Sequence, residues 1–369
     1  MLLDFIDTLT ESVEGPRIPH PEDTIFTSST DAMKCIDTLE NIIQHPESIT
    51  IKWDGGIALF FGISPKGEFF ISDKYMYPAG FCATSPAEWE RYDTTIKSSK
   101  TARTDLYPKL AALWNGLKAS VTTAAVFKGD LMAIGNEMVP QNNNFVFRPV
   151  TVLYTVPVRS QLGELMQGKA ALVVVHSMNQ QPWDGTTGLQ NNSNVAIVNP
   201  NLAPLMQGGI KFKLNEPVQL LRSAKHAVAT HGTLADDFLT GLDGAMKGRI
   251  KTYFNKLITQ QTPEKFDAWL QNPENKISKK QITKLVVGST GENGNSIPPY
   301  LVSNRAGWRA LVHVWNAVYA LKVSMNDSLQ AQVTGIGQSI NGVSSGEGFV
   351  SNGIKLVNRG VFGVAHFNK

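Results

Sequence analysis

The hydrophobic pattern of the chain changes twice, and these two changes limit what it can fold into. Short strand-like runs dominate up to about residue 215, whereas residues 217–332 carry apolar side chains at helical spacing. Strand-like runs return after Gly346, where only about two dozen residues remain. A segment that short is too small to bury a core of its own. The sequence therefore predicts an α+β domain that is interrupted by a helical insertion and completed by the last strands.

The pattern also predicts individual elements and a division of the chain. Apolar residues recur at helical spacing over 30–43, after a cap at Ser29 or Thr30, and a second helix is expected over 105–119. The sequence "DGG" between the first two strands predicts a tight hairpin turn. Strands are expected at 49–53, 57–63, 68–72, 124–128, 145–148, 150–158 and 170–176. The predicted parts are 1–215 for the first part of the core, 216–335 for the helical insertion and 336–369 for the closing strands.

Composition sets broad limits on location and partners. The net charge of +3 is mild, so it permits an anionic partner without demanding one. Cys35 and Cys82 lack metal-ligand spacing and favour a reducing compartment. The start of the chain does not resemble a signal peptide, and no apolar run approaches the ~20 residues that span a membrane. We therefore expect a cytoplasmic protein without a membrane partner.

The stretch "IKWDGG" carries the first chemical signal. It places Lys52 and Asp54 two residues apart at the end of an apolar strand. A lysine in a partly dry site can lose its proton and act as a nucleophile. A neighbouring carboxylate alone would raise the pKa of that lysine, so a second cation or a metal ion is needed as well. Gly55 would let a phosphate approach the backbone. The structural alternative is a salt-bridged hairpin.

Three later stretches strengthen the catalytic interpretation. "VFKGDLM" places Asp130 at the end of a strand, "GEGFV" places Glu347 at the start of another, and "GIKLVNR" places Lys355 on a third. A lysine nucleophile, two carboxylates and a second lysine suit the transfer of a nucleotide from a triphosphate. The alternatives are a solvated strand end, a turn cap and an edge-strand lysine.

In their order and their amino-acid sequences these motifs resemble those of the covalent nucleotidyltransferases, which include ATP-dependent DNA and RNA ligases and mRNA capping enzymes. The form K-x-D-G matches Lys52, Asp54 and Gly55, and E-G-x-V matches Glu347, Gly348 and Val350. The remaining matches are Lys74 in "ISDKYM", Asp130 in "FKGDL", Tyr154 in "VTVLYTVPV" and Lys355 on the last strand. The chain is also similar to a ligase-like family of tailed bacteriophages, through "HPED" at 20–23, the strand at 145–156 and the E-G-[IFV]-V strand.

The resemblance implies a fold, a reaction and a set of site residues. The implied fold has the antiparallel sheets and flanking helices of a ligase adenylation domain, without a C-terminal oligonucleotide-binding barrel. The implied activity is an ATP-dependent polynucleotide ligase with a covalent lysyl-AMP intermediate, Mg²⁺ as cofactor, and RNA as the preferred nucleic acid. The implied catalytic residues are Lys52, Asp54, Glu347 and Lys355. The implied nucleotide-binding residues are Ile51, Gly55, Lys74, Asp130 and Tyr154, with Asp130 and Glu347 as metal ligands.

Departures from the family pattern keep two alternatives open. Ile57 stands where DNA ligases usually carry an arginine, and Val357 where a second lysine is usual. The chain could transfer a nucleotide to a different acceptor, or it could be a non-catalytic phage protein that works with other phage proteins. Tyr154 and His176 are both interpreted first as structural residues. The basic run "NKISKKQITK" is interpreted as a solvated face, with contact to phosphate as the alternative.

Overall fold

The computed structural model describes residues 20–64, 66–96, 103–200, 215–259, 265–290, 295–333, 335–344, 346 and 348–361. Over these residues the chain is mixed α+β, with mainly antiparallel sheets and no closed barrel. It forms two compact units, each assembled from separate stretches of chain. The first unit contains the described residues within 50–209 and 333–347, and the second contains those within 18–49, 210–332 and 348–369.

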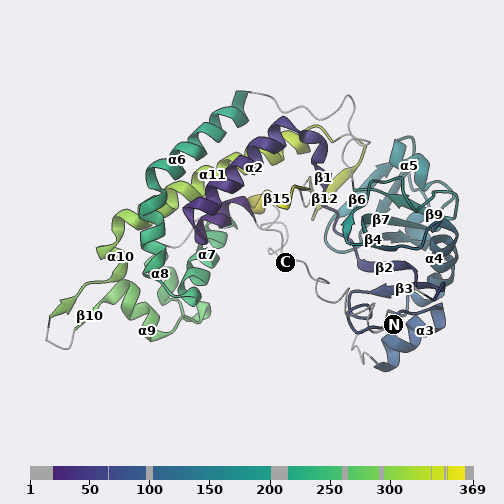
Figure 1. The fold of residues 1–369 in the computed structure, drawn as a ribbon, viewed down its shortest axis with the longest axis horizontal. Coiled ribbons are helices and arrows are strands. Elements are labelled where there is room, and N and C mark those ends of the chain that lie inside the picture. The colour runs from purple at the N-terminus through teal and green to yellow at the C-terminus, as the bar shows by residue number, and fades with distance from the viewer. Residues whose placement is uncertain are drawn as a thin grey trace. The chain divides into compact units, whose positions relative to one another are not determined.

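A six-stranded sheet forms the centre of the first unit (Figure 1). Its order is β3–β2–β4–β7–β8, with β9 parallel to β7 and all other neighbours antiparallel. One face packs on helices α3 (Pro86–Arg91) and α4 (Tyr107–Ser120), because alternate apolar residues of each strand point to that side. The strands are β2 (Ile57–Ile63), β3 (Phe69–Asp73), β4 (Val126–Ile134), β7 (Ala171–Met178), β8 (Gln181–Pro182) and β9 (Val195–Val198).

A second, four-stranded antiparallel sheet completes this unit, in the order β13–β12–β6–β5. Its strands are β5 (Asn144–Phe147), β6 (Leu153–Pro157), β12 (Gly337–Ile340) and β13 (Val343–Ser344). The chain thus returns to the first unit after the helical block. The smaller elements are β1 (Thr50–Ile51), η3 (Tyr92–Ile96), η4 (Gly135–Met138) and α5 (Gln161–Met166).

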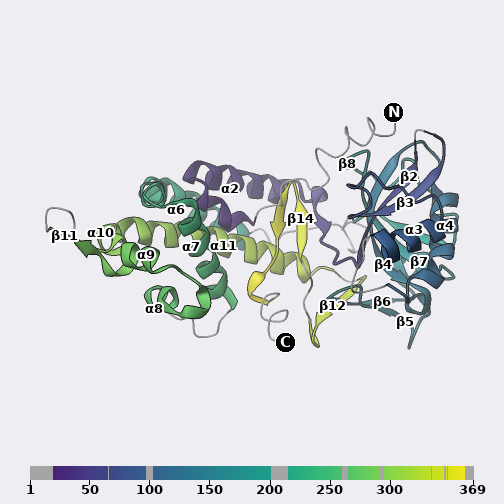
Figure 2. The same cartoon turned by 90° about the horizontal axis from the view of Figure 1, so that it is seen from below.

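The second unit is mainly helical. Its long helices α6 (Asn215–Thr240) and α11 (Arg305–Gln330) pack side by side, and α2 (Ser29–Gln44) packs on α6 (Figure 2). Asp236 of α6 accepts hydrogen bonds from the backbone and hydroxyl of Ser29, which fixes the start of α2. The shorter elements are η1 (Pro21–Phe26), η2 (Pro46–Ser48), α7 (Gly244–Thr259), α8 (Phe266–Gln271), η6 (Pro273–Asn275), α9 (Lys279–Ile282), η7 (Thr283–Val287), β10 (Ser289–Thr290), β11 (Ser296–Ile297), α10 (Tyr300–Ser303), β14 (Phe349–Ser351) and β15 (Ile354–Leu356).

A buried ion cluster joins distant parts of the second unit. Lys322 is fully buried and its amino group contacts Glu22 Oε1 at 2.5 Å. Arg359 also contacts Glu22 and lies 3.0 Å from a carboxylate oxygen of Asp23. Lys251 contacts the other oxygen of Asp23 at 3.1 Å. Burial would raise the pKa of Asp23, but the charges of Arg359 and Lys251 outweigh burial and lower it. The "HPED" segment is therefore the acidic half of this cluster.

This cluster accounts for a difference from the predicted division. The segments within 18–49 and 348–369 belong with the helices, although the sequence placed both in the strand-rich core. Glu22 and Arg359 are held by helix residues and by each other, and β15 packs on α11 and η1. A buried charge needs its partners, so these segments must accompany the helices.

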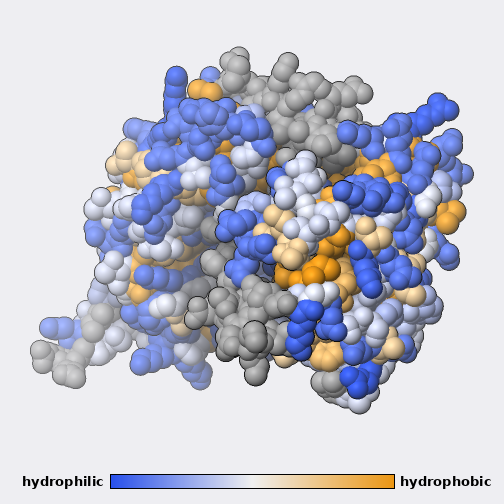
Figure 3. All heavy atoms as spheres, turned by 45° about the vertical axis from the view of Figure 1, so that its right-hand side comes forward, coloured by the Kyte–Doolittle hydropathy of each residue, from blue (hydrophilic) through white to orange (hydrophobic). Residues whose placement is uncertain are grey.

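The local elements agree well with the predicted ones. The helices predicted over 30–43 and 105–119 are α2 and α4, and the cap of α2 is Ser28 rather than Ser29 or Thr30. No helix in the described part of the chain combines the length and the apolar character needed to cross a bilayer. The face drawn in Figure 3 is mainly hydrophilic, with hydrophobic residues visible in small groups.

We expect the substitution Lys322→Met to destabilise the protein by about 3–5 kcal/mol, because it leaves a buried carboxylate without one of its cations. Urea unfolding monitored by circular dichroism measures this change. The matched control is Lys225→Met, which breaks the more exposed pairs of Lys225 with Asp37 and Glu40. We expect the control to cost less than about 1 kcal/mol. Equal losses in the two variants would contradict the role given to burial.

His20 should make stability fall in mild acid. Burial, helped by the charge of Arg359, lowers the pKa of His20 to about 3, against about 6.5 in the unfolded chain. Between these two pKa values the unfolded chain binds a proton at His20 and the folded protein does not. The free energy of unfolding is therefore unaffected by His20 above pH 6.5 and decreases as the pH falls toward 3. Urea unfolding at pH 7.5, 6 and 5 should show a loss of about 1 kcal/mol per pH unit that is absent in His20→Asn. Parallel pH profiles would rule this out.

Candidate functional site

The turn that follows β1 places the candidate nucleophile in the first unit. Ile51 is buried and its N–H donates to the carbonyl of Pro200 at 2.9 Å. Lys52 comes next and is half-buried. The chain then runs through Asp54 and two glycines into β2, which begins at Ile57. The predicted hairpin between these two strands is wrong, because β2 pairs with β3 and β4.

Asp54 is held by the second sheet and its loop. One carboxylate oxygen of Asp54 accepts hydrogen bonds from the N–H groups of Thr151 and Val152, at 2.9 and 3.3 Å. The N–H of Asp54 donates to the hydroxyl of Tyr154 at 2.8 Å. The polar groups of the turn are therefore engaged by residues about 100 positions away, which explains why no local hairpin forms.

Tyr154 supports the turn from the core. Its ring is fully buried and stacks on Trp53 and Phe147, with centroid distances of 5.4 and 5.2 Å. Burial raises the pKa of the Tyr154 phenol, so it remains neutral and can accept the hydrogen bond from Asp54. The resemblance implied nucleotide contact for Tyr154, whereas the residue itself was interpreted first as structural. In this structure the ring contacts protein, and the hydroxyl positions Asp54.

Gly55 lies directly against Asp130. A Cβ atom on Gly55 would stand 2.2 Å from the Cβ of Asp130, so only glycine allows this approach. Asp130 was predicted at the end of a strand, and that detail is wrong: it lies in the middle of β4, which continues to Ile134. Asp130 pairs with Ala58 of β2 in the sheet register. Asp54, which follows Lys52, and Asp130, which lies on β4, are thus both brought to one end of β2.

His176, which the sequence favoured as a structural residue, contacts a residue of the candidate site. Its Nε2 atom lies 2.8 Å from Oδ2 of Asp130. The register between β4 and β7 shifts between Lys128 and Gly129, and this bulge leaves His176 between paired positions. The side chain comes to the same face as Asp130. The apolar run before His176 predicted the strand correctly, but nothing in the sequence indicated the bulge.

Two lysines flank these carboxylates along the sheet. Lys128 is exposed on β4, two residues before Asp130, with its amino group 5.6 Å from the centre of the Phe60 ring. Lys74 is exposed directly after β3. Because β3 and β4 lie on either side of β2, about 10 Å separates their backbones. Lys128 was not among the predicted site residues. It joins the candidate site because it lies on the same face of the sheet as Asp130.

Asp73 fixes the turn that carries Lys74. It is buried and accepts hydrogen bonds from the N–H groups of Tyr75 and Met76, each at 2.8 Å. Its other oxygen accepts a hydrogen bond from Arg103 at 2.8 Å. The loop therefore has a defined shape before any ligand binds.

Three further positions of the motifs are Lys355, Val357 and Glu347. Lys355 is half-buried on β15 of the second unit, opposite Val350 of β14. Burial is the main cause that lowers the pKa of His20, and the charge of Lys355 is the smallest contribution. Val357 is buried, so no cation stands at the position of the usual second lysine. Glu347 lies outside the residues that the structure describes.

The metal expectation rests on Asp130. Among the described residues no group of three histidine, cysteine or carboxylate side chains could hold a metal ion. Mg²⁺ in nucleotide enzymes usually takes only one or two protein carboxylates, with phosphate oxygens and water as the other ligands. Asp130 is partly exposed, at 22% of its side chain, and fits that role as a single protein ligand.

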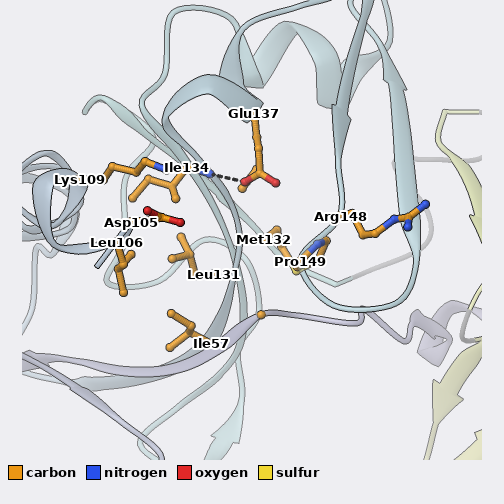
Figure 4. A pocket seen from close by; sticks show the side chains of 12 residues that line it. Ile57, Asp105, Leu106, Lys109, Leu131, Met132, Ile134, Glu137, Arg148 and Pro149 are labelled. Atoms are coloured by element: carbon orange, nitrogen blue, oxygen red, sulfur yellow. Dashed lines mark hydrogen bonds between the residues drawn. The ribbon is translucent and has the colours of Figure 1, made fainter. Parts of the chain in front are cut away.

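A pocket of about 240 Å³ borders the turn at Gly56 (Figure 4). It forms where β4 extends past the start of β2, so residues after Leu131 have no partner from β2. Lys109 and Asp105 lie on one side of it, Glu137 lies on another, and the guanidinium of Arg148 points away. Its charges are balanced and its walls are largely apolar. The pocket therefore offers no excess of either charge to a ligand.

Comparison with known proteins gives a family for the chain. Residues 17–369 match the model of DUF6267, described as a family of unknown function. The chain belongs to this family. No curated protein matches it, and no solved structure matches it. The description of DUF6267 names no activity, so the roles of the residues are argued from their chemistry and geometry.

In this DUF6267 member, Gly55→Ala should disrupt the site. The new methyl group would overlap the side chain of Asp130, and overpacking of this kind costs about 1–3 kcal/mol. The control is Gly248→Ala in α7, where nothing lies within 4 Å of the added Cβ. There we expect a gain of up to about 1 kcal/mol from helix propensity. Thermal unfolding measures both, and an unaffected Gly55→Ala variant would contradict the close contact.

Proposed function

We propose that the chain is a covalent nucleotidyltransferase that carries AMP on Lys52 and acts as an ATP-dependent polynucleotide ligase. The observation that supports this most is the rigid turn after Lys52. Gly55 packs on Asp130, and Asp54 is fixed by the backbone of Thr151 and Val152. A half-buried lysine and two positioned carboxylates are what nucleotide transfer through a lysine needs.

In the first step the neutral Lys52 amine attacks the α-phosphorus of ATP. A phosphorus–nitrogen bond forms, the bond to the oxygen that bridges to the β-phosphate breaks, and pyrophosphate leaves with that electron pair. The nitrogen of Lys52 then loses one proton to solvent, which leaves the neutral nitrogen of the phosphoramide bond in lysyl-AMP. Lys74 and Lys128 are the exposed cations near the carboxylates and would neutralise the developing phosphate charge. Mg²⁺ held at Asp130 would supply further charge neutralisation.

Asp130 and Asp54 have different roles in this proposal. Asp130, positioned by His176, holds the metal or the ribose. Asp54, positioned by backbone N–H groups and Tyr154, orients the ribose or the incoming strand end. Lys355 and Glu347 keep the roles that the family resemblance implies, in phosphate and metal binding.

The later steps transfer AMP to a strand end and then release it. An oxygen of a 5′-phosphate attacks the lysyl-AMP, so the phosphorus–nitrogen bond breaks and a 5′–5′ diphosphate forms. A 3′-hydroxyl then attacks the 5′-phosphate, closes the strand and displaces AMP. RNA is the preferred substrate in this proposal, because Ile57 replaces the arginine of DNA ligases.

Incubation with α-³²P-ATP and Mg²⁺ tests this proposal. We expect label on the denatured wild-type protein and none on Lys52→Arg, which keeps the charge but removes the nucleophile. The matched control is Lys66→Arg, an exposed lysine of the same unit, which should label normally. The label should resist alkali, be released by acid and be removed by pyrophosphate, as expected for lysyl-AMP. Absence of label on protein first stripped with pyrophosphate would overturn the proposal.

A further inference from the structure

One segment of the second unit holds more than all of the chain's excess positive charge. Residues 244–284 contain nine lysines and arginines and three acidic residues, a net charge of +6. The whole chain carries +3, so the remainder carries −3. The mild total therefore conceals a strongly basic region that includes α7, α8 and α9.

Part of this charge is used inside the unit. Lys251 pairs with Asp23, and Lys256 donates to the side-chain oxygen of Asn275 at 3.0 Å. Arg249 donates to the carbonyls of Asn275 and Lys276. These contacts fold the segment and leave other lysines for the surface.

Three lysines remain on a short stretch of surface. Lys276, Lys279 and Lys280 are all exposed, and none forms an ion pair within the described residues. They lie within five positions of one another, at the end of η6 and on α9. Exposed cations this close repel each other, which costs free energy unless an anion binds between them.

The loop that presents them has a defined conformation. Lys276 has φ of 50°, and it is the one lysine among the described non-glycine residues with positive φ. The left-handed region costs a lysine about 1–2 kcal/mol. Asn275 supports it, because its buried amide donates to the Trp269 carbonyl at 2.7 Å. Ser278 and Gln281 cap α9 reciprocally. Strain of this kind persists where the surrounding structure fixes it, often at binding surfaces.

We propose that the surface formed by Lys276, Lys279 and Lys280 binds the phosphate backbone of a nucleic acid without reading its sequence. Sequence or base recognition would need exposed aromatic rings or base-edge contacts. The aromatic residues nearby, Tyr253 and Trp269, are buried in the core. A phosphate backbone needs only cations and hydrogen-bond donors, which this surface provides. The inference stands whether or not Lys52 forms a covalent intermediate.

Fluorescence anisotropy with the full-length chain tests the proposal. The probes are a labelled 20-nucleotide RNA and the corresponding single-stranded DNA, at 50–300 mM KCl. The variant combines Lys276→Asn, which suits left-handed backbone, with Lys279→Gln and Lys280→Gln. We expect binding at least tenfold weaker at 50 mM KCl. The slope of log affinity against log salt should fall by about 2, since each single-strand phosphate contact contributes about 0.7.

The matched control removes three exposed lysines outside this surface, through Lys34→Gln, Lys66→Gln and Lys118→Gln. It has the same net charge as the variant, so binding close to wild type assigns the effect to position. Equal loss in both triple variants would overturn the proposal, as would binding to phosphatidylserine vesicles but to neither nucleic acid. Circular dichroism confirms the fold of each variant. Lysyl-AMP labelling is measured separately and should be unchanged in both.

Discussion

The buried carboxylates of Glu22 and Asp23 fix the organisation of the second unit. They contact cations from three distant positions, Lys251, Lys322 and Arg359. Four of these five groups are buried or largely buried while Lys251 is partly exposed, and removing four charges from water is a cost that only close mutual contact offsets. If any one of these segments separated from the unit, a buried charge would therefore remain in the apolar core without its partner. This constraint explains why segments near both ends of the described chain belong with helices that lie between them in sequence.

Most of the structure that could be predicted from the sequence followed from local patterns of neighbouring residues. The helical spacing over 30–43 and the apolar runs of β2 and β3 depend on neighbouring residues, and these elements were predicted closely. The partners of Glu22 lie about 300 positions away, so no local pattern could indicate them. The hairpin prediction failed for the same reason, because distant backbone groups bind Asp54. The position of Asp130 in the middle of its strand could have been predicted from the sequence, since the apolar residues after it continue the strand.

The candidate site was predictable in its residues but not in its supports. The motif located Lys52, Asp54 and Gly55 in one turn, and the close contact with Asp130 follows from the strand register. Tyr154 and His176 act through positions that only the folded sheets create. Tyr154 holds the backbone N–H of Asp54 and His176 contacts the carboxylate of Asp130, so both residues are positioned before any ligand binds. A motif specifies which groups react, whereas packing across the two sheets specifies where they stand.

The separation of charge between the units follows from the chemistry proposed for each. In the proposal for the first unit, the carboxylates of Asp54 and Asp130 work together with a small number of lysines, so charges of both signs are needed there. A surface that binds a phosphate backbone needs an excess of cations, and Lys276, Lys279 and Lys280 outnumber the neighbouring Glu274. The chain places Asp54 and Asp130 in the first unit and the lysines of 276–280 in the second. Each unit can then keep the charge pattern that its own partner requires, and the small net charge of the whole chain is the sum of two unlike parts.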